Sequence, residues 1–167
     1  VGTDLLRGVV KNIREKIISL GGEVRFNTQV TDFIVENNQI TGVKVKGGDV
    51  IESNHVIVAI GHSARDTFYH MYDRGVQFTA TPFAVGVRVE HPQTLIDQAQ
   101  YKEFAGHEKL GAAEYRLTHT ASNGRGVYTF CMCPGGLVVP SSSEKGRLVT
   151  NGMSEHARDQ ENANSAL

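Results

Sequence analysis

The chain has 167 residues, and its 17 lysines and arginines against 18 aspartates and glutamates give a formal net charge of -1. This balance lacks the basic excess typical of nucleic-acid binders, and no apolar run approaches the roughly 18 residues that span a bilayer. We therefore expect no nucleic-acid or membrane partner, and by default a cytoplasmic location. The length allows one domain with its own core, or parts of two.

Residues 3–20 are the first predicted element, an amphipathic helix that packs on a sheet. Thr3 is a suitable N-cap, Asp4 suits the positive end of the helix dipole, and the glycine pair 21–22 favours a stop. Apolar residues recur along one stripe at helical spacing. They are Leu6, Val9, Val10, Ile13, Ile17 and Leu20.

Alternating apolar and polar residues then predict short strands that form a β-meander. The strands are expected at residues 23–27, 29–36, 39–46 and 50–52. Asn37 and Asn38 lie between the second and the third, and asparagine tolerates the positive φ of a tight hairpin turn. The glycine pair 47–48 predicts the next reversal.

The apolar run 56–60 leads directly into Gly61 and is the most informative local feature. A strand without polar positions is usually buried on both faces, as in an α/β sheet, where ligands lie beyond the carboxyl ends of the strands. A glycine there lets a ligand or another backbone approach closely. We predict one side of a cofactor site at Ala59, Ile60 and Gly61, with close helix–strand packing as the alternative. The Gly-x-Gly-x-x-Gly turn that usually forms the other side is absent from the chain.

A helix is predicted from Ser63 to about residue 74, because Ser63 can act as N-cap with Asp66 three residues on. Unpaired N–H groups point outward at the amino end of a helix, which makes that end a potential anion site. Arg65 lies there and could meet a phosphate. The alternative for Arg65 is an ordinary solvated charge.

Composition changes near residue 80, so we expect two domains, residues 1–80 and 81–167. The first has the pattern of half an α/β nucleotide-binding layer with a β-meander, and the second that of an inserted, mixed and β-rich module. The predicted fold class is therefore a mixture of α+β and α/β. The elements expected in the second part are strands at 83–90, 127–133, 137–139 and 147–151, and a helix from Pro92 to about Tyr101.

Arg88 shares one face of the predicted strand 83–90 with small residues, Ala84 and Gly86. A guanidinium in such a place suits a carboxylate substrate held by two parallel hydrogen bonds, which makes Arg88 a candidate catalytic residue. The alternative is a structural salt bridge, with Glu90 or Asp97 as the partner.

The two cysteines, Cys131 and Cys133, lie on the predicted strand 127–133. A thiolate of lowered pKa can carry redox chemistry, which makes both of them candidate catalytic residues. One alternative is a pair of buried thiols that pack as small hydrophobic groups. Another is zinc with His119 or His156, but a Cys-x-Cys spacer is shorter than zinc sites use, so no metal is expected.

The polar run at 151–164 contains Asn151, Asn162 and Asn164. Asparagine favours caps and turns, so we predict turns and helix caps in this run. The alternative is a set of amides that hydrogen-bond a substrate beside a cofactor.

Three motifs of the first part occur in the same order in a known flavoprotein domain. They are Gly21-Gly22-Glu23-Val24, Asn27-Thr28-Gln29-Val30 and Ala59-Ile60-Gly61. In these motifs residues 1–80 resemble the second half of the FAD domain of glutathione-reductase-type flavoproteins, where the last motif reads Ala-Thr-Gly. Ile60 replaces that threonine, which removes a hydroxyl and keeps the course of the backbone.

The second part carries longer motifs, at residues 82–92, 124–136 and 150–154. With them the whole chain resembles the bacterial NAD(FAD)-utilising dehydrogenase-like family of FAD-dependent proteins. The resemblance implies FAD as cofactor, NAD(P)H as a candidate donor, and hydride transfer to or from a small-molecule substrate. It places Val30 at the adenine and Ala59, Ile60 and Gly61 near the phosphates or ribose, with Arg65 at a phosphate or the flavin edge. A thiolate at Cys131 or Cys133 beside the flavin would relay electrons or form an adduct.

The resemblance further implies a dinucleotide-binding βαβ unit before Val1 and an FAD-contacting segment after Leu167. The chain starts without a methionine or a signal-peptide pattern, so we expect an internal segment of a longer protein. Such a segment alone is expected to be inactive and to hold FAD weakly. The alternative function is a non-catalytic FAD- or nucleotide-binding sensor or a partner-binding module.

Overall fold

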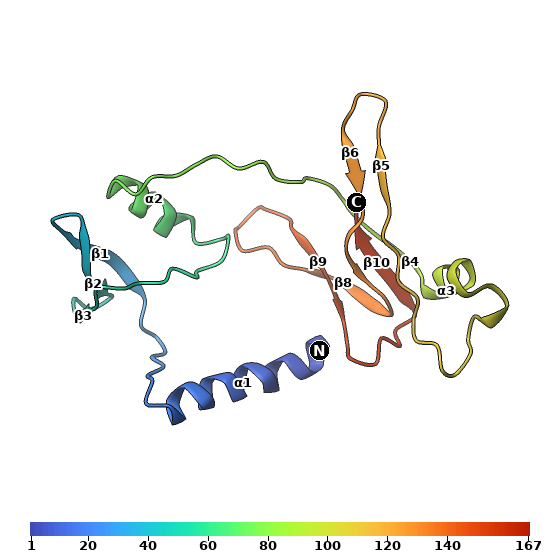
Figure 1. Cartoon of the computed structure of the whole chain (residues 1–167), viewed down its shortest axis with the longest axis horizontal. Coiled ribbons are helices and arrows are strands. Elements are labelled where there is room, and N and C mark those ends of the chain that lie inside the picture. Colours follow the sequence, from blue (N-terminus) through green and yellow to red (C-terminus); the bar gives the residue numbers. More distant parts are fainter. The chain divides into compact units, whose positions relative to one another are not determined.

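The computed structural model describes every residue from Val1 to Leu167, and the chain divides into two compact units. Unit 1 comprises Val1–Leu20 together with Ala84–Leu167, and unit 2 comprises Gly21–Phe83. Helices and small antiparallel sheets occur together along the chain, which confirms the predicted mixed α and β character (Figure 1). None of the helices combines the length and the apolar character that crossing a bilayer demands.

The elements follow one another along the chain as Figure 1 labels them. The helices are α1 (Thr3–Ser19), α2 (Arg65–Asp73), α3 (Gln93–Tyr101) and the short 3-10 helix η1 (Lys102–Phe104). The strands are β1 (Val30–Glu36), β2 (Gln39–Val45), β3 (Val50–Glu52), β4 (Arg88–Pro92), β5 (Thr118–Thr120), β6 (Gly126–Tyr128), β7 (Phe130–Cys133), β8 (Gly136–Pro140), β9 (Thr150–Ser154) and β10 (Asn162–Ala166). They pair in the orders β1-β2-β3, β4-β10-β7, β5-β6 and β8-β9.

The predicted first helix is confirmed as α1, but its cap and its surroundings differ from the prediction. Gly2 is the N-cap, and Thr3 is the first helical residue, whose hydroxyl donates to Ser154 O at 3.2 Å. Asp4 accepts the His156 backbone N–H at 2.9 Å, and this hydrogen bond holds the pKa of that carboxyl below its usual value. No residue of α1 is buried. The predicted packing of its apolar stripe on a sheet is wrong, because amphipathic spacing specifies a face without supplying a partner for it.

Strands β1, β2 and β3 of unit 2 form the predicted antiparallel meander. Asn37 and Asn38 connect the first two strands with φ angles of 51° and 62°. Such a turn needs positive φ at both central residues, which asparagine adopts at little cost. Val43 and Val45 on β2 are 8% and 7% exposed and form the small apolar core of this unit.

Two strands predicted in unit 2 are absent. Residues 23–27 and 56–60 have no strand partner, and Ile57 is 93% exposed. An extended segment becomes a strand only where a neighbouring ladder takes up its N–H and C=O groups, and the meander ends at Glu52. The apolar composition of residues 56–60 therefore predicted a burial that the other strands of this unit do not provide.

The helix predicted after Gly61 is confirmed as α2, with a later start. Ala64 holds the N-cap position in place of Ser63, because it directly precedes the first helical residue, Arg65. The Ser63 carbonyl accepts the Arg65 N–H at 2.9 Å, which leaves Ser63 outside the helix. Gly75 follows the last turn with a φ of 84°, a left-handed conformation that commonly ends helices.

Asp32 fastens α2 to β1 within unit 2. One carboxylate oxygen lies 2.8 Å from His70 Nε2, and the other accepts an Arg74 Nη2 hydrogen bond at 2.6 Å. The Phe33 backbone N–H adds a third contact at 2.7 Å. The hydrogen bond to His70 is the main reason why the pKa of Asp32 lies below its usual value, and the contacts with Phe33 and Arg74 act in the same direction. Both oxygens of this carboxylate are therefore satisfied.

The main sheet of unit 1 has β10 as its central strand, between β4 and β7. This strand lies in the polar run where the sequence predicts turns and caps, so that prediction is wrong for residues 162–166. Ala163, Asn164 and Ser165 are each 0% exposed. Small and amide side chains fill the space between two flanking strands here, where a β-strand is ordinarily recognised by large branched residues.

The strand predicted at 83–90 is β4, which begins only at Arg88. Its ladder with β10 ends at Val87 and Leu167, whose backbones exchange two hydrogen bonds of 3.1 and 2.8 Å. Residues 83–86 have no partner strand and lie outside the sheet. The start of β4 is thus set by the reach of β10 and not by the apolar pattern.

Two hairpins complete unit 1. The predicted strands around the serine turn 141–143 are confirmed as β8 and β9, and both differ by a few residues from the predicted bounds. The predicted strand 127–133 is divided into β6 and β7 at Thr129. The hydroxyl of Thr129 accepts the Leu117 N–H at 2.8 Å, which draws the chain toward the segment before β5. β6 pairs with β5, a strand that the sequence does not predict.

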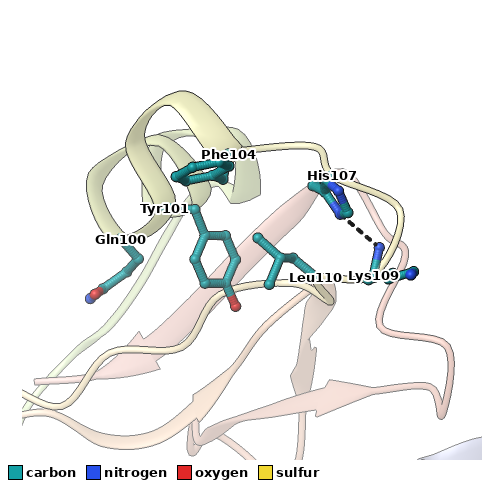
Figure 2. A pocket seen from close by; sticks show the side chains of 6 residues that line it. All are labelled: Gln100, Tyr101, Phe104, His107, Lys109 and Leu110. Carbon is teal, nitrogen blue, oxygen red and sulfur yellow. Dashed lines mark hydrogen bonds between the residues drawn. The ribbon is translucent and has the colours of Figure 1, made fainter.

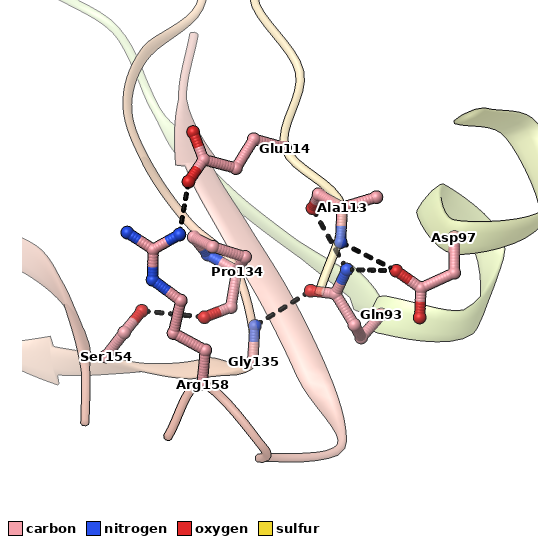
Figure 3. A network of polar contacts seen from close by, with 8 residues as sticks. All are labelled: Gln93, Asp97, Ala113, Glu114, Pro134, Gly135, Ser154 and Arg158. Carbon is pink, nitrogen blue, oxygen red and sulfur yellow. Dashed lines mark hydrogen bonds and ion pairs between the residues drawn. The ribbon is translucent and has the colours of Figure 1, made fainter. Parts of the chain in front are cut away.

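Gln93 connects α3 to the turn before β8, as Figure 3 shows. Its Nε2 donates to Asp97 Oδ1 at 2.8 Å and to Ala113 O at 3.0 Å, and its Oε1 accepts the Gly135 N–H at 2.8 Å. The Ala113 N–H donates to the same Asp97 oxygen at 2.8 Å. Gln93 is 6% exposed, so this buried amide has all its groups paired and acts as a structural junction.

Candidate functional site

Arg88, Cys133 and Asn164 lie on one face of the β4-β10-β7 sheet. Arg88 is opposite Ala166 on β10, and Cys133 is opposite Asn164. Residues two apart along a strand point to the same face, so Asn164 and Ala166 share a face with these two partners. The sheet therefore brings two predicted catalytic residues together, with Cys131 two residues from Cys133 on β7.

Arg88 binds neutral acceptors and not a carboxylate. Its Nη1 donates to Asn164 Oδ1 at 2.7 Å and to the Cys131 carbonyl at 3.0 Å. The predicted alternative of a salt bridge with Glu90 or Asp97 is wrong, because both carboxylates take other hydrogen-bond donors. The positive charge of Arg88 is thus held in place without a negative partner.

β7 contains a bulge at Cys131 that aims its carbonyl at Arg88. Between the pairs Asn164–Cys133 and Ala166–Phe130, β7 has one residue more than β10. Cys131 has a φ of 46°, a left-handed conformation that costs a non-glycine residue about 1–2 kcal/mol. Bulges and strained residues of this kind concentrate at functional sites, where they redirect individual groups.

Both cysteines are free, and they differ in exposure. Cys131 is exposed and Cys133 is half-buried, with Cys133 Sγ lying 3.5 Å from the Cys131 carbonyl oxygen. The alternative of two buried thiols is therefore wrong for Cys131, which is exposed. The structure gathers no group of three histidine, cysteine or carboxylate side chains, so neither His119 nor His156 joins the cysteines at a metal site.

Gly152 on β9 packs directly over the cluster. A Cβ added at this glycine would lie 2.1 Å from Asn164 Oδ1, 2.4 Å from Arg88 Nη1 and 2.8 Å from Cys133 Sγ. These separations are far below van der Waals contact, so only glycine fits at this position. Gly152 therefore defines the shape of the space around the guanidinium.

Two buried N–H donors of the cluster have no partner. They are Arg88 Nε and Asn164 Nδ2, and Asn164 itself is 0% exposed. A buried polar group without a hydrogen bond costs about 1–3 kcal/mol, and native structures contain few of them. Both groups are hydrogen-bond donors, so an acceptor atom is the partner that suits them.

The predicted cofactor-binding residues belong to unit 2. Val30 begins β1, and Arg65 begins α2. Ala59, Ile60 and Gly61 lie in an exposed segment without regular structure. Gly61 has a φ of 73°, and a Cβ built there would have no atom within 4 Å. The left-handed backbone conformation therefore favours glycine at position 61, and the space beside it is open.

A hollow of about 430 Å³ lies at the end of α3 and contains no residue of the Arg88 cluster. Figure 2 shows its lining, which is mainly hydrocarbon and includes one lysine and one histidine. The lining residues are Gln100, Tyr101, Phe104, His107, Lys109 and Leu110. The one hydrogen bond drawn among them runs from Lys109 N–H to His107 Nδ1 at 3.2 Å.

Comparison with known families identifies the family of this chain. Residues 82–167, just over half of the chain, match the family described as "FAD-dependent protein, C-terminal domain-like". The chain belongs to this FAD-dependent family. The matched residues include Arg88, Cys131, Cys133, Gly152 and Asn164, so the whole cluster lies inside the family's domain.

A relative from Clostridium beijerinckii, described as an uncharacterized protein, is 54% identical over 168 residues. The match covers 100% of this chain and 31% of the relative. The chain thus spans about a third of the length of the curated relative that it matches.

Sequence reasoning missed Gly152 as a member of the site and gave Asn164 only within the alternative of a substrate-binding set of amides. An asparagine in a turn has the same local pattern as one in a central strand. Gly152 had no signal of its own, because the groups that crowd it come from β4, β7 and β10.

Proposed function

We propose that the chain is part of an FAD-dependent oxidoreductase that transfers hydride between FAD and a small-molecule substrate or NAD(P)H. Membership of an FAD-dependent family supports the flavin. The observation that carries the site is the pair of unpartnered buried donors, Arg88 Nε and Asn164 Nδ2, within the family's domain. Structural clusters normally satisfy such groups, so their presence favours a ligand site.

The residues of unit 2 fit the diphosphate and nucleoside parts of FAD. Open space beside the left-handed backbone of Gly61 admits a phosphate, and Arg65 lies at the amino end of α2, where anions are favoured. Val30 offers the backbone of an edge strand to the adenine. We further propose that residues 56–60 join a Rossmann-like layer in the whole protein, which would bury apolar side chains that are exposed in the chain alone.

FAD, when bound, supplies the two-electron chemistry, and the protein supplies binding and orientation. In this proposal Arg88 orients the substrate, with its guanidinium fixed by Asn164 and by the Cys131 carbonyl. In the same proposal, Cys131 and Cys133 are the thiols that contact the reacting groups. Cys131 has the exposure that a reactive thiol requires.

Purification of the whole protein tests the flavin assignment. The expected product is yellow and carries one FAD per chain, whereas residues 1–167 alone are expected to be colourless and inactive. Anaerobic addition of NADH and of NADPH should then bleach the flavin band with at least one of the donors. Bound FAD that stays oxidised with both would contradict the oxidoreductase and favour the alternative, a non-catalytic FAD- or nucleotide-binding sensor or partner-binding module.

Thiol alkylation tests the placement of the cysteines. Cys131 in the FAD-free protein should react quickly, because its side chain is exposed, and bound FAD should slow the reaction. Cys133, which is half-buried, should react more slowly in both states. Equal rates for Cys131 with and without FAD would place this thiol away from the cofactor.

A further inference from the structure

The free hydrogen-bonding capacity of the Arg88 cluster consists of donors. Arg88 commits Nη1 to Asn164 Oδ1 and to the Cys131 carbonyl, while its Nε is buried without a partner. Asn164 commits its Oδ1 to Arg88, and its Nδ2 is unpartnered and buried. A ligand that completes this cluster has to bring acceptor oxygens.

The charge of the cluster points to an anion. The carboxylate nearest to Arg88 along β4 is Glu90, and it accepts a hydrogen bond from Asn162 Nδ2 at 2.8 Å. The two groups that hold Arg88 are an amide and a backbone carbonyl, which carry no net charge. The guanidinium therefore keeps its full positive charge next to unsatisfied donors.

The fixed orientation of the guanidinium favours a planar anion. The two bonds to Nη1 hold one edge of the group, which leaves the Nε–Nη2 edge with two parallel N–H donors. That fork matches the two oxygens of a carboxylate. The Asn164 amide adds a donor on the same face of the sheet.

We propose that Arg88 and Asn164 bind the carboxylate of a small organic acid, and that this acid is the substrate class of the flavin reaction. This inference rests on the proposed function, because the flavin gives the bound acid its reaction. Asn164 is then a specificity-determining residue. Its neutral amide donates a hydrogen bond to the bound anion, whereas an aspartate at this position would repel the anion.

Calorimetric titration of the whole protein with benzoate and with its neutral analogue benzamide tests the proposal. Benzoate should bind at least about tenfold more tightly, because only the carboxylate pairs with the guanidinium fork. Arg88→Met and Asn164→Asp should each weaken benzoate binding by about tenfold or more. Asn164→Asp keeps the shape of the side chain and the acceptor for Arg88 Nη1, so it is the less disruptive of the two variants.

Arg147→Met is the matched control, because Arg147 is a surface arginine whose side chain is 76% exposed and pairs with Glu144. This variant should bind benzoate as the wild type does. Equal affinity for benzoate and benzamide, or unchanged benzoate affinity in Asn164→Asp, would overturn the proposal.

The acceptor oxygens come either from a substrate carboxylate or from the flavin itself. The flavin absorbance of the same samples distinguishes these two sources. A wild-type protein that holds FAD and binds benzoate, beside an Asn164→Asp variant that holds FAD and does not, supports the substrate site. Loss of FAD in the Asn164→Asp variant, with no benzoate binding by the wild type, would assign the donors to the flavin itself and overturn the proposal. A wild type that binds benzoate and lacks FAD contradicts the proposed function and leaves the anion site standing.

Discussion

Two polar clusters, one in each unit, differ in how completely their groups are satisfied. In unit 2, Asp32 takes contacts from His70, Arg74 and the Phe33 backbone, so both of its oxygens are paired. In unit 1, Arg88 and Asn164 keep buried donors without an acceptor. The first cluster has all that it needs to fasten a helix to a strand. The second keeps buried donors without an acceptor, and this difference is the observation on which we base the proposal of a ligand site.

The left-handed residues of the two units show the same contrast. In unit 2 they include the turn residues Asn37 and Asn38, and asparagine tolerates this conformation. In unit 1, Cys131 adopts it inside a strand, where it produces a bulge and turns a carbonyl toward Arg88. The turn costs little and shapes a hairpin, whereas the bulge is strained and shapes the site.

Gly152→Ala should have the largest effect on stability. Its Cβ would lie 2.1 Å from Asn164 Oδ1, so the cluster has to move or β9 has to lift. Overpacking of this severity costs about 3 kcal/mol. Urea unfolding would measure the loss, with Gly111→Ala as the control, because a Cβ at Gly111 meets nothing within 4 Å. Equal stabilities of the two variants would mean that the space over the cluster is open.

Arg88→Met and Arg74→Met compare the two clusters directly. Loss of Arg88 leaves Asn164 Oδ1 buried without its donor, at a cost of about 2 kcal/mol. Loss of Arg74, whose side chain is 51% exposed, removes one ion pair of Asp32 and should cost less than about 1 kcal/mol. Thermal unfolding gives both values. A larger loss of stability in Arg74→Met than in Arg88→Met would contradict our view that the buried hydrogen bond of Arg88 contributes more than the exposed ion pair of Arg74.

Asp32→Asn should change how stability depends on pH. The pKa of Asp32 is lower in the folded chain than in the unfolded chain, where carboxyls titrate near about 3.9. The stabilisation that ionised Asp32 gives the folded chain is therefore complete above that value, and it is lost as the pH falls through the lowered pKa. We expect Asp32→Asn to cost about 1 kcal/mol at neutral pH. The gap between the two proteins should close in acid, and a constant gap down to the lowest pH would remove Asp32 as its cause.

Cys131→Gly should have a smaller effect than the changes above, with the opposite sign. Glycine relieves the left-handed strain and adds flexibility to the unfolded chain, so we expect a net gain of about 0.5 kcal/mol. Asn38→Gly should change stability by less, since asparagine already suits its turn. Cys133→Gly, at a residue without positive φ, should destabilise. If Cys131→Gly destabilised as much, the bulge would not be strained.

The sequence correctly predicts elements that depend on local spacing and residue type. It fails where a neighbouring strand determines whether a segment joins a sheet. The stripe of α1 and the turn at Asn37 and Asn38 both follow from spacing and residue type. The run 56–60 was predicted as a strand from its composition, but no ladder in unit 2 receives it. β10 was missed because its buried positions are alanine, asparagine and serine, which signal a strand only once β4 and β7 flank them.

The site divides in the same way. Arg88, Cys131 and Cys133 were predicted from their residue types and they meet on one sheet, although their use by a substrate or a flavin stays a prediction. Asn164 completes the cluster through a register that depends on pairing across β10. The lack of a carboxylate near Arg88 likewise follows from the partners of Glu90 and Asp97 and not from their distance in sequence.

The central claim is that the Arg88 cluster faces a flavin and binds an acid beside it. The difference absorption spectrum of the whole, FAD-containing protein on addition of benzoate tests this most directly. The account predicts a saturable change in the flavin bands of the wild type and none in the Asn164→Asp variant. Benzoate that binds through Arg88 while the flavin bands stay unchanged would contradict it, because the acid would then lie away from the cofactor.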